Sequence, residues 1–179
     1  MTKSVFLAAA TLAASTIVFA QGKKKPLSPP AETSVTIGGK TLSVKYSAPS
    51  MRGRKIFGDG GVVSHDSTYP VWRAGANAAT AFHTDADLDI AGLSVPKGDY
   101  TLFVLVNTDP WQLIISKQTG EWGLAYKQDM DLGRVRMTMA KPSSPIETYK
   151  ITLSSAGGKS GKLQLEWENV IASVPITVK

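Results

Sequence analysis

Residues 100–106 read YTLFVLV, and they give the strongest fold signal in this 179-residue chain. The run combines aromatic and β-branched residues with leucine and shows no helical spacing of polar residues. Residues 107–110 (NTDP) are typical of a turn, and residues 111–116 (WQLIIS) form a second β-forming run. An apolar run of this length without alternation predicts a strand that is buried on both faces. We therefore expect these two segments to be paired strands at the centre of the fold.

The segments on either side predict more strands. Residues 35–37 and 42–46 both alternate apolar with polar residues, and Gly38-Gly39 between them is typical of a tight turn, which together predict a β-hairpin. Helical periodicity is scarce, and only residues 120–131 leave room for one helical turn. The other predicted strands are residues 71–72, 80–90, 93–97, 134–139, 148–153, 163–167 and 170–178.

These segments predict one all-β domain over residues 32–179, a β-sandwich or barrel-like domain of roughly nine or ten short strands. Residues 154–161 predict a small, flexible hairpin loop. This loop departs from the phosphate-binding pattern, because Ala156 stands where the first glycine belongs and Leu163 where Ser or Thr is required. We expect no bound cofactor. The four tryptophans are expected in the core: Trp72, Trp111, Trp122 and Trp167.

Residues 1–20 have the three parts of a secretory signal peptide: Lys3 near the start, an apolar run over residues 5–19, and small residues at a cleavage-like end at Ala20. The apolar run is shorter than the roughly 20 residues that a spanning helix needs, so we expect cleavage rather than a membrane anchor. The chain has no cysteine, which excludes a lipoprotein anchor and disulfides. The sequence therefore predicts an exported protein, periplasmic or secreted, with no membrane span after cleavage.

A basic, proline-rich linker is predicted over residues 21–31. The whole chain carries a formal net charge of +6, and removing the four lysines at positions 3, 23, 24 and 25 leaves +2. The high isoelectric point is thus largely an effect of the N-terminal segment. It does not indicate a nucleic-acid-binding surface, which needs basic residues clustered on one face of the domain.

Four motifs give the chain a family resemblance. They are residues 53–58 (GRKIFG), 71–80 (VWRAGANAAT), 95–102 (VPKGDYTL) and 165–168 (LEWE). The series closely resembles the uncharacterised bacterial family catalogued as domain of unknown function 2911 (DUF2911), over residues 28–178. The resemblance implies an exported bacterial protein and supports the domain boundaries. It implies no known activity, so no catalytic residue follows from it.

An acidic cluster and a basic, aromatic cluster are the candidate sites. If residues 80–90 form one strand, His83, Asp85, Asp87 and Asp89 share a face, as in either a cation site or an ordinary solvated face. Same-face neighbours lie about 7 Å apart, too far for one ion to reach them all, so we expect no metal site. The preferred site is a polar pocket for a ligand, and its candidate residues are Arg54, Lys55, Trp72, Arg73, Asn77 and His83. The competing interpretation makes these side chains structural.

Two functional hypotheses follow. The leading one is an exported, non-catalytic binding or structural module for a small molecule such as a small anion, a glycan, a peptide or an envelope-protein partner. The alternative is an exported hydrolase or metal-assisted enzyme that uses His83 with Arg73 and Asn77. An enzyme requires titratable groups that converge in a cleft, whereas a binding module requires only an exposed polar and aromatic patch.

Overall fold

The computed structural model describes residues 26–179, so the predicted signal peptide and most of the predicted linker lie outside the described residues. Thirteen strands form within this range, more than the nine or ten predicted. The strands are β1 (Pro30–Ile37), β2 (Lys40–Ser47), β3 (Val71–Trp72), β4 (Thr80–Thr84), β5 (Leu88–Ile90), β6 (Leu93–Val95), β7 (Gly98–Leu105), β8 (Gln112–Ser116), β9 (Asp131–Arg136), β10 (Thr138–Ala140), β11 (Ile146–Gly157), β12 (Ser160–Glu168) and β13 (Val170–Val178). Two short 3-10 turns complete the set, η1 (Val62–His65) and η2 (Gln128–Met130).

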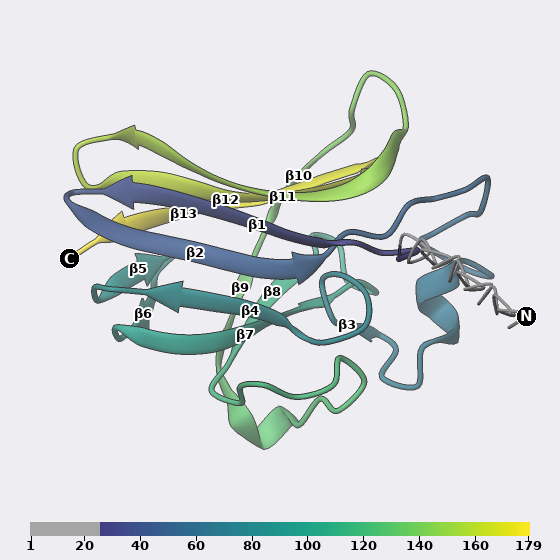
Figure 1. Cartoon of the computed structure of the whole chain (residues 1–179), viewed down its shortest axis with the longest axis horizontal. Coiled ribbons are helices and arrows are strands. Elements are labelled where there is room, and N and C mark those ends of the chain that lie inside the picture. Colours follow the sequence, from purple (N-terminus) through teal and green to yellow (C-terminus); the bar gives the residue numbers. More distant parts are fainter. Residues whose placement is uncertain (1–25) are drawn as a thin grey trace, which may run out of the picture.

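The strands form two antiparallel sheets that pack against each other (Figure 1). The first sheet has the order β1-β2-β4-β7-β8-β9, and β3 pairs with β7 beyond the end of β4. The second sheet has the order β11-β12-β13-β5-β6, and β10 also pairs with β13. The domain is therefore an all-β sandwich, as predicted, and not a closed barrel. No helix in the described part of the chain is long and apolar enough to cross a membrane.

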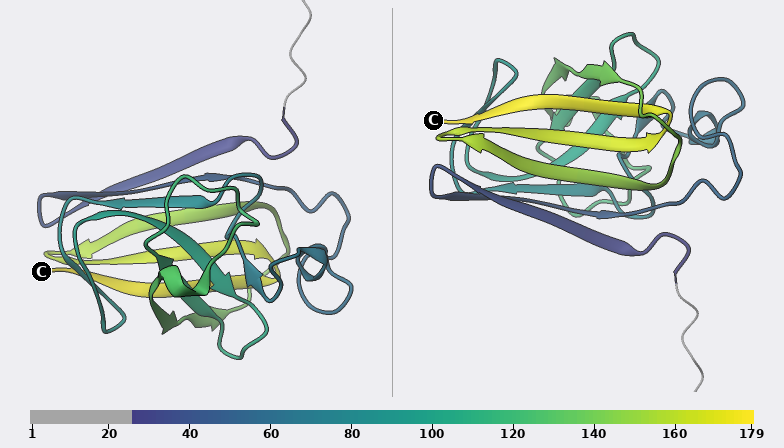
Figure 2. Two further views of the ribbon diagram at one scale, coloured as in Figure 1. Left: turned by 90° about the horizontal axis from the view of Figure 1, so that it is seen from below. Right: turned by 90° about the horizontal axis from the view of Figure 1, so that it is seen from above.

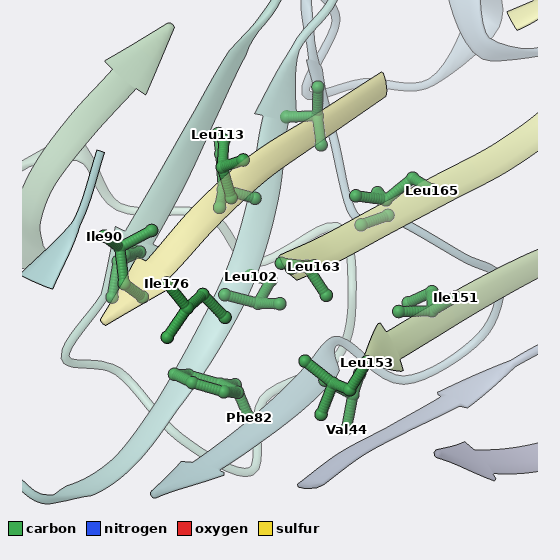
Figure 3. Close-up of a cluster of buried hydrophobic side chains, with 14 of the residues drawn as sticks. Val44, Phe82, Ile90, Leu102, Leu113, Ile151, Leu153, Leu163, Leu165 and Ile176 are labelled. Carbon is green, nitrogen blue, oxygen red and sulfur yellow. The ribbon is translucent and has the colours of Figure 1, made fainter. Parts of the chain in front are cut away.

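The core lies between the two sheets and consists of alternate side chains from facing strands (Figure 3). Each of these side chains is almost fully removed from water, which stabilises the fold by about 1.5–3 kcal/mol per large apolar residue. The residues labelled in the figure are Val44, Phe82, Ile90, Leu102, Leu113, Ile151, Leu153, Leu163, Leu165 and Ile176.

Strand β7 is buried on both faces, as its sequence predicted. Leu102 and Val104 face the core, while Phe103 faces outward and is equally buried. Phe103 packs with Ile114 and with the ring of Tyr126 in a small second cluster. Tyr126 belongs to residues 117–130, a segment that we name the strap, which crosses the outer face of the first sheet (Figure 2, left). The strap also contains η2, the single helical turn that the sequence allowed.

The prediction of one strand over residues 80–90 is wrong. The chain leaves the first sheet after Thr84 and enters the second sheet at Leu88. The buried hydroxyl of Thr84 donates to the carbonyl of Ala86 and accepts from its N–H, which fixes the bend between the two strands. The predicted row of His83, Asp85, Asp87 and Asp89 on one strand face therefore does not exist.

Four further predictions need correction. Residues 134–139 divide into β9 and β10, in different sheets, because the chain turns at the buried Met137. The predicted loop over residues 154–161 is mostly strand, since glycines at positive φ allow β11 and β12 to join through a tight turn at Gly158-Lys159. Trp122 is 57% exposed and lies outside the core. Strand β1 begins at Pro30, so the last two residues of the predicted linker belong to the domain.

A buried carboxylate fixes the glycine-rich loop that follows β2. Glu168, at the end of β12, is 8% exposed, and its Oε1 accepts a hydrogen bond of 2.8 Å from the backbone N–H of Ile56. Ile56 is fully buried in the core. This contact helps to join the loop after β2 to the second sheet, because it satisfies a backbone donor that is removed from water.

Replacing Glu168 tests this contact. Glu168→Ala leaves the Ile56 N–H without its acceptor, so we expect the free energy of unfolding to fall by about 1–3 kcal/mol and the Tm by roughly 2–10 °C. Urea and thermal denaturation, followed by circular dichroism, measure both quantities.

Two variants serve as controls. Glu168→Gln keeps a side-chain acceptor and should lose clearly less stability. Glu166→Ala, on the same strand, removes only a 3.6 Å ion pair with Lys150 and should change stability by no more than about 0.5 kcal/mol. Equal losses for Glu166→Ala and Glu168→Ala would contradict the anchoring role.

Candidate functional site

Three of the four motifs that carry the family resemblance meet at one end of the sandwich. The loop of residues 53–58 is held by Glu168 through Ile56. The ring of Phe57 then lies 5.3 Å from Trp72 and 5.8 Å from Trp167, in edge-to-face contacts. These motifs, which lie far apart in the sequence, therefore build one aromatic platform beneath the loops at this end.

Arg73 is fixed in place at this end. Its Nη2 lies 2.9 Å from Oδ1 of Asp66, and the two side chains are 12% and 20% exposed. Gly123 of the strap packs directly on the aliphatic part of Arg73, where an added Cβ would approach the Cδ atom to 2.3 Å. The arginine thus lies between the η1 region and the strap, and its guanidinium group has little freedom to move.

Arg54 approaches the same place from the glycine-rich loop. Its Nε and Nη2 donate to the carbonyls of Met51 and Ser50, both at 2.9 Å, while the side chain stays exposed. Together with Arg73 it lines a concavity of about 220 Å³, which we name the loop-end concavity. Its polar lining residues are Ser28, Arg54, Asp66, Arg73 and Asn77. Two guanidinium groups against one carboxylate leave this concavity with an excess of positive charge.

The structure therefore brings four of the six predicted site residues together. Asn77 lines the loop-end concavity from a left-handed backbone conformation with a φ of 61°. Trp72 is only 2% exposed and donates its Nε1–H to the carbonyl of Gly75, so it cannot offer a free flat face to a ligand. Lys55 points elsewhere and donates to the carbonyl of Asp59. Trp72 is therefore a structural core residue, as the competing interpretation of the sequence proposed.

His83 lies apart from the other predicted site residues, on the outer face of the first sheet. It lines a different concavity, which shares no lining residue with the loop-end concavity. Its Nδ1 is 2.7 Å from Asp99 and its Nε2 is 3.0 Å from Asp85. The combination of His83 with Arg73 and Asn77, on which the enzyme hypothesis was built, is thus not assembled in this fold.

The other aspartates of the acidic segment have structural contacts. Asp87 accepts from the backbone N–H of Lys97, and Asp89 accepts from that of Gly92. No group of three or more His, Cys, Asp or Glu side chains within residues 26–179 is arranged to hold a metal ion.

A family model described as a protein of unknown function, DUF2911, matches residues 28–176. The chain belongs to the DUF2911 family. The match covers the whole sandwich apart from the last residues of β13. Comparison with curated proteins and with solved structures found no match.

A hollow larger than the loop-end concavity was not predicted from the sequence. Three adjoining concavities of about 480, 320 and 280 Å³ all include Lys45 in their lining, and we name them together the Lys45 trough. The trough lies on the outer face of the first sheet, beside the strap. Its polar lining residues include Glu32, Ser43, Lys45, His83, Asp99, Thr119 and Glu121.

No local signal marks the two most unusual members of the trough. Lys45 occupies an ordinary polar position in the alternation of β2, yet it forms no ion pair with any described residue. Glu121 lies within residues 120–131, for which the sequence predicted at most one helical turn. Both of its carboxylate oxygens are shielded from water and have no hydrogen-bond partner within residues 26–179.

The contacts of His83 predict a pH dependence. Hydrogen bonds that His83 donates to Asp85 and Asp99 raise the pKa of His83 above its ordinary value of 6.5, and the bond to Asp85 lowers the pKa of Asp85 below 3.8. The histidine contribution to stability is fully present below pH 6.5 and is lost as the pH rises through the raised pKa. The contribution of Asp85 is present above pH 3.8 and is lost as the pH falls. The cluster therefore stabilises the domain most between these two values.

Thermal melts of His83→Gln and the unmodified protein between pH 4 and pH 9 test this expectation. The Tm difference should be small, roughly 1–2 °C, because the cluster is exposed. It should be greatest near pH 5 and disappear above the raised pKa. A difference that stays constant over this range would contradict a charged histidine.

Proposed function

We propose that this protein is an exported, non-catalytic binding module that captures a small anion, or the anionic end of a larger molecule, in the loop-end concavity. The observation that carries the proposal is the convergence of Arg54 and Arg73 on one small hollow that contains a single carboxylate among its described lining residues. Arginine recognises carboxylate and phosphate groups through parallel, charge-assisted hydrogen bonds.

The two arginines are arranged to bind without large rearrangement. Asp66 and Gly123 hold Arg73, and two backbone carbonyls hold Arg54. Arg54 uses Nε and Nη2 in these contacts, so its Nη1 is left to donate to a ligand. Side chains that are already ordered lose little conformational entropy on binding, which favours affinity.

The size and chemistry of the hollow support binding rather than catalysis. A volume of about 220 Å³ is below the range typical of sites for drug-sized molecules, and it suits a single charged group. Asp66 is committed to Arg73, so it is not poised as a general base. His83, the histidine of the enzyme hypothesis, lies in the other hollow.

Export is supported by the composition of the N-terminal segment. Residues 1–20 have the order of charge, apolar run and small residues that signal peptidase reads, and the absence of cysteine excludes a lipid anchor at the cleavage point. An exported binding module with loops on a rigid β scaffold is a common arrangement.

Substitution of Arg54 tests the anion site. Calorimetric titration of residues 21–179 with phosphate, citrate and a short peptide with a free C-terminal carboxylate should detect binding of at least one probe. Arg54→Ala should weaken that binding about tenfold or more, because one charge-assisted hydrogen bond is lost. Added salt should weaken binding as well, because the hollow is open to solvent.

Lys55→Ala is the matched control. It removes the same charge from the same loop, but Lys55 does not line the concavity, so binding should change less than twofold. Equal losses of affinity in the two variants would mean that only the overall charge of the loop matters, which contradicts a specific role for Arg54. Absence of binding by all three probes would refute the anion site.

Processing and location are tested in a bacterial host. We expect the mature protein to begin at Gln21 and to be found in the periplasmic or extracellular fraction. N-terminal sequencing and cell fractionation measure this, and an Ala20→Arg variant should block cleavage. An unprocessed wild-type chain in the cytoplasm would refute export.

A further inference from the structure

We infer that the free edge of strand β1 is a dimerisation surface, on which a second copy of this chain adds its own β1 in antiparallel orientation and joins the two first sheets into one. The inference does not depend on the loop-end concavity. It rests on the free backbone groups of β1, on the absence from β1 of the features that protect the other edges, and on the way this strand complements itself.

The turn after β1 determines which of its backbone groups are free. Gly38 and Gly39, with φ of 57° and 76°, form a two-residue turn, and the residues on either side of such a turn exchange backbone hydrogen bonds. Bonded and unbonded pairs then alternate along an antiparallel ladder, so every second residue of β1 directs its N–H and C=O groups away from β2. These residues are Glu32, Ser34 and Thr36. Their outward backbone groups bond to no backbone group of any other described residue.

The nearest edge of the second sheet, β11, is already closed. Three alternate N–H groups on its free side donate to oxygen atoms of the first sheet and of the loop after β2. The donors are Tyr149, Ile151 and Leu153, and their acceptors are, in the same order, the carbonyl of Pro49 and the hydroxyls of Tyr46 and Thr33. Two register shifts interrupt β11 as well, and such irregularities hinder pairing with another chain.

The remaining edges in the described part of the chain are short or charged. Strands β3, β6 and β10 have only two or three residues each. Strand β9 carries three charged side chains, and Leu93 packs against its Gly133. Strand β1, in contrast, has eight residues in unbroken register, a single charge at Glu32, and proline only at its first position. It therefore lacks the devices by which proteins prevent edge pairing, and both views in Figure 2 show it at the periphery of the domain.

Two β1 strands complement each other when they run antiparallel with Ser34 opposite Ser34. Glu32 of one copy then lies opposite Thr36 of the other, so all three free residues pair and up to about six backbone hydrogen bonds form. Hydroxyl groups face each other at the centre and a carboxylate faces a hydroxyl on each side, so no like charges meet. A shift by two residues in either direction would place one of the three opposite Pro30 or Gly38, at the ends of the strand.

A second copy also covers the inner side of the edge. Ala31, Thr33 and Val35 are only half-buried there, and Val35 packs against the core. In the same register Val35 lies opposite Thr33 of the second copy, so apolar surface is removed from water. An extended peptide of another protein would share the backbone bonds, but the match of side chains across the two-fold axis favours a second copy.

Sedimentation equilibrium of residues 21–179 over about a thousandfold range of concentration tests the inference. We expect a reversible equilibrium between monomer and dimer without larger species, because this contact uses the free edge of each copy. A monomer at every concentration would overturn the inference and would leave the edge to an extended segment of another protein. A series of larger oligomers would overturn it too.

Charges at residue 34 test the register. Ser34→Lys places two ammonium groups opposite each other and Ser34→Glu two carboxylates, so each variant alone should dimerise at least about tenfold more weakly. An equimolar mixture of the two variants should recover dimerisation, because opposite charges then face each other. A mixture that remains as weak as the single variants would contradict the pairing of residue 34 with itself.

Thr177→Lys is the matched control. It adds the same charge as Ser34→Lys, but on the exposed face of β13, which lies within the second sheet, so dimerisation should not change. Equal weakening by the two lysine variants would attribute the effect to net charge and overturn the edge contact. Arg54→Ala should also leave dimerisation unchanged, so the anion site and the dimer fail independently.

Ser34→Pro tests the backbone bonds themselves. It removes the N–H at the centre of the free edge and none of the bonds to β2, so dimerisation should be lost while the Tm of the monomer changes by no more than about 4 °C. Amide hydrogen exchange adds a readout that needs no variant. The N–H groups of Glu32, Ser34 and Thr36 should exchange more slowly as the protein concentration rises, whereas those of Thr33 and Val35 should not respond. A dimer that leaves the first three unprotected would place the contact elsewhere and refute the inference.

Discussion

No disulfide joins the two sheets of this domain, because the chain contains no cysteine. Stability therefore depends on the layer of apolar side chains between the sheets, where Leu102 and Leu113 of the first sheet face Leu165 and Ile176 of the second (Figure 3). The central strand β7 also needs cover on its outer face, since Phe103 projects there. The strap supplies that cover through Tyr126, and the position of the strap in turn sets where a hollow remains.

Backbone strain is concentrated at the loop end. Of the five non-glycine residues with positive φ in the described part of the chain, four lie there: Arg52, Ala74, Asn77 and Glu168. Such conformations are costly and persist only when the surrounding contacts enforce them. Here the contacts are the Glu168 bond to Ile56, the hydroxyl of Thr80 on the carbonyl of Ala74, and the stacked Trp72 and Trp167 rings. Three of the four motifs that carry the family resemblance thus form one structural unit, and this unit fixes the approach of Arg73 to Arg54.

The two hollows differ in how the fold makes them. The loop-end concavity is built by ordered, paired groups, so its donors are preorganised. The Lys45 trough forms where small floor residues such as Ala78 and Ala81 lie beside the edge of the strap.

Much of the fold was readable from local sequence. Alternation across Gly38-Gly39 predicted the first hairpin, and the continuous run over residues 100–106 predicted a strand buried on both faces. These features depend on side-chain periodicity and turn chemistry, which are encoded within a few residues. The same rules failed at residues 80–90, where a pattern suited to one strand conceals a bend. The Thr84 hydroxyl fixes that bend. Residues 80–84 then pair with β2 and residues 88–90 pair with β13, and these contacts between distant segments cannot be read from the local sequence.

The candidate sites show the same division. The sequence alone determined that Arg54, Arg73 and Asn77 belong to loop segments rich in glycine and polar residues, and this was enough to nominate them. Only the tertiary structure decided that they share a hollow, that Trp72 is core, and that His83 lies on another face. The Lys45 trough depends on residues more than 70 positions apart in the chain, which the docking of the strap on the first sheet brings together. Periodicity along the chain specifies which face of a strand a side chain occupies, but only the packing of distant segments specifies what lies opposite it.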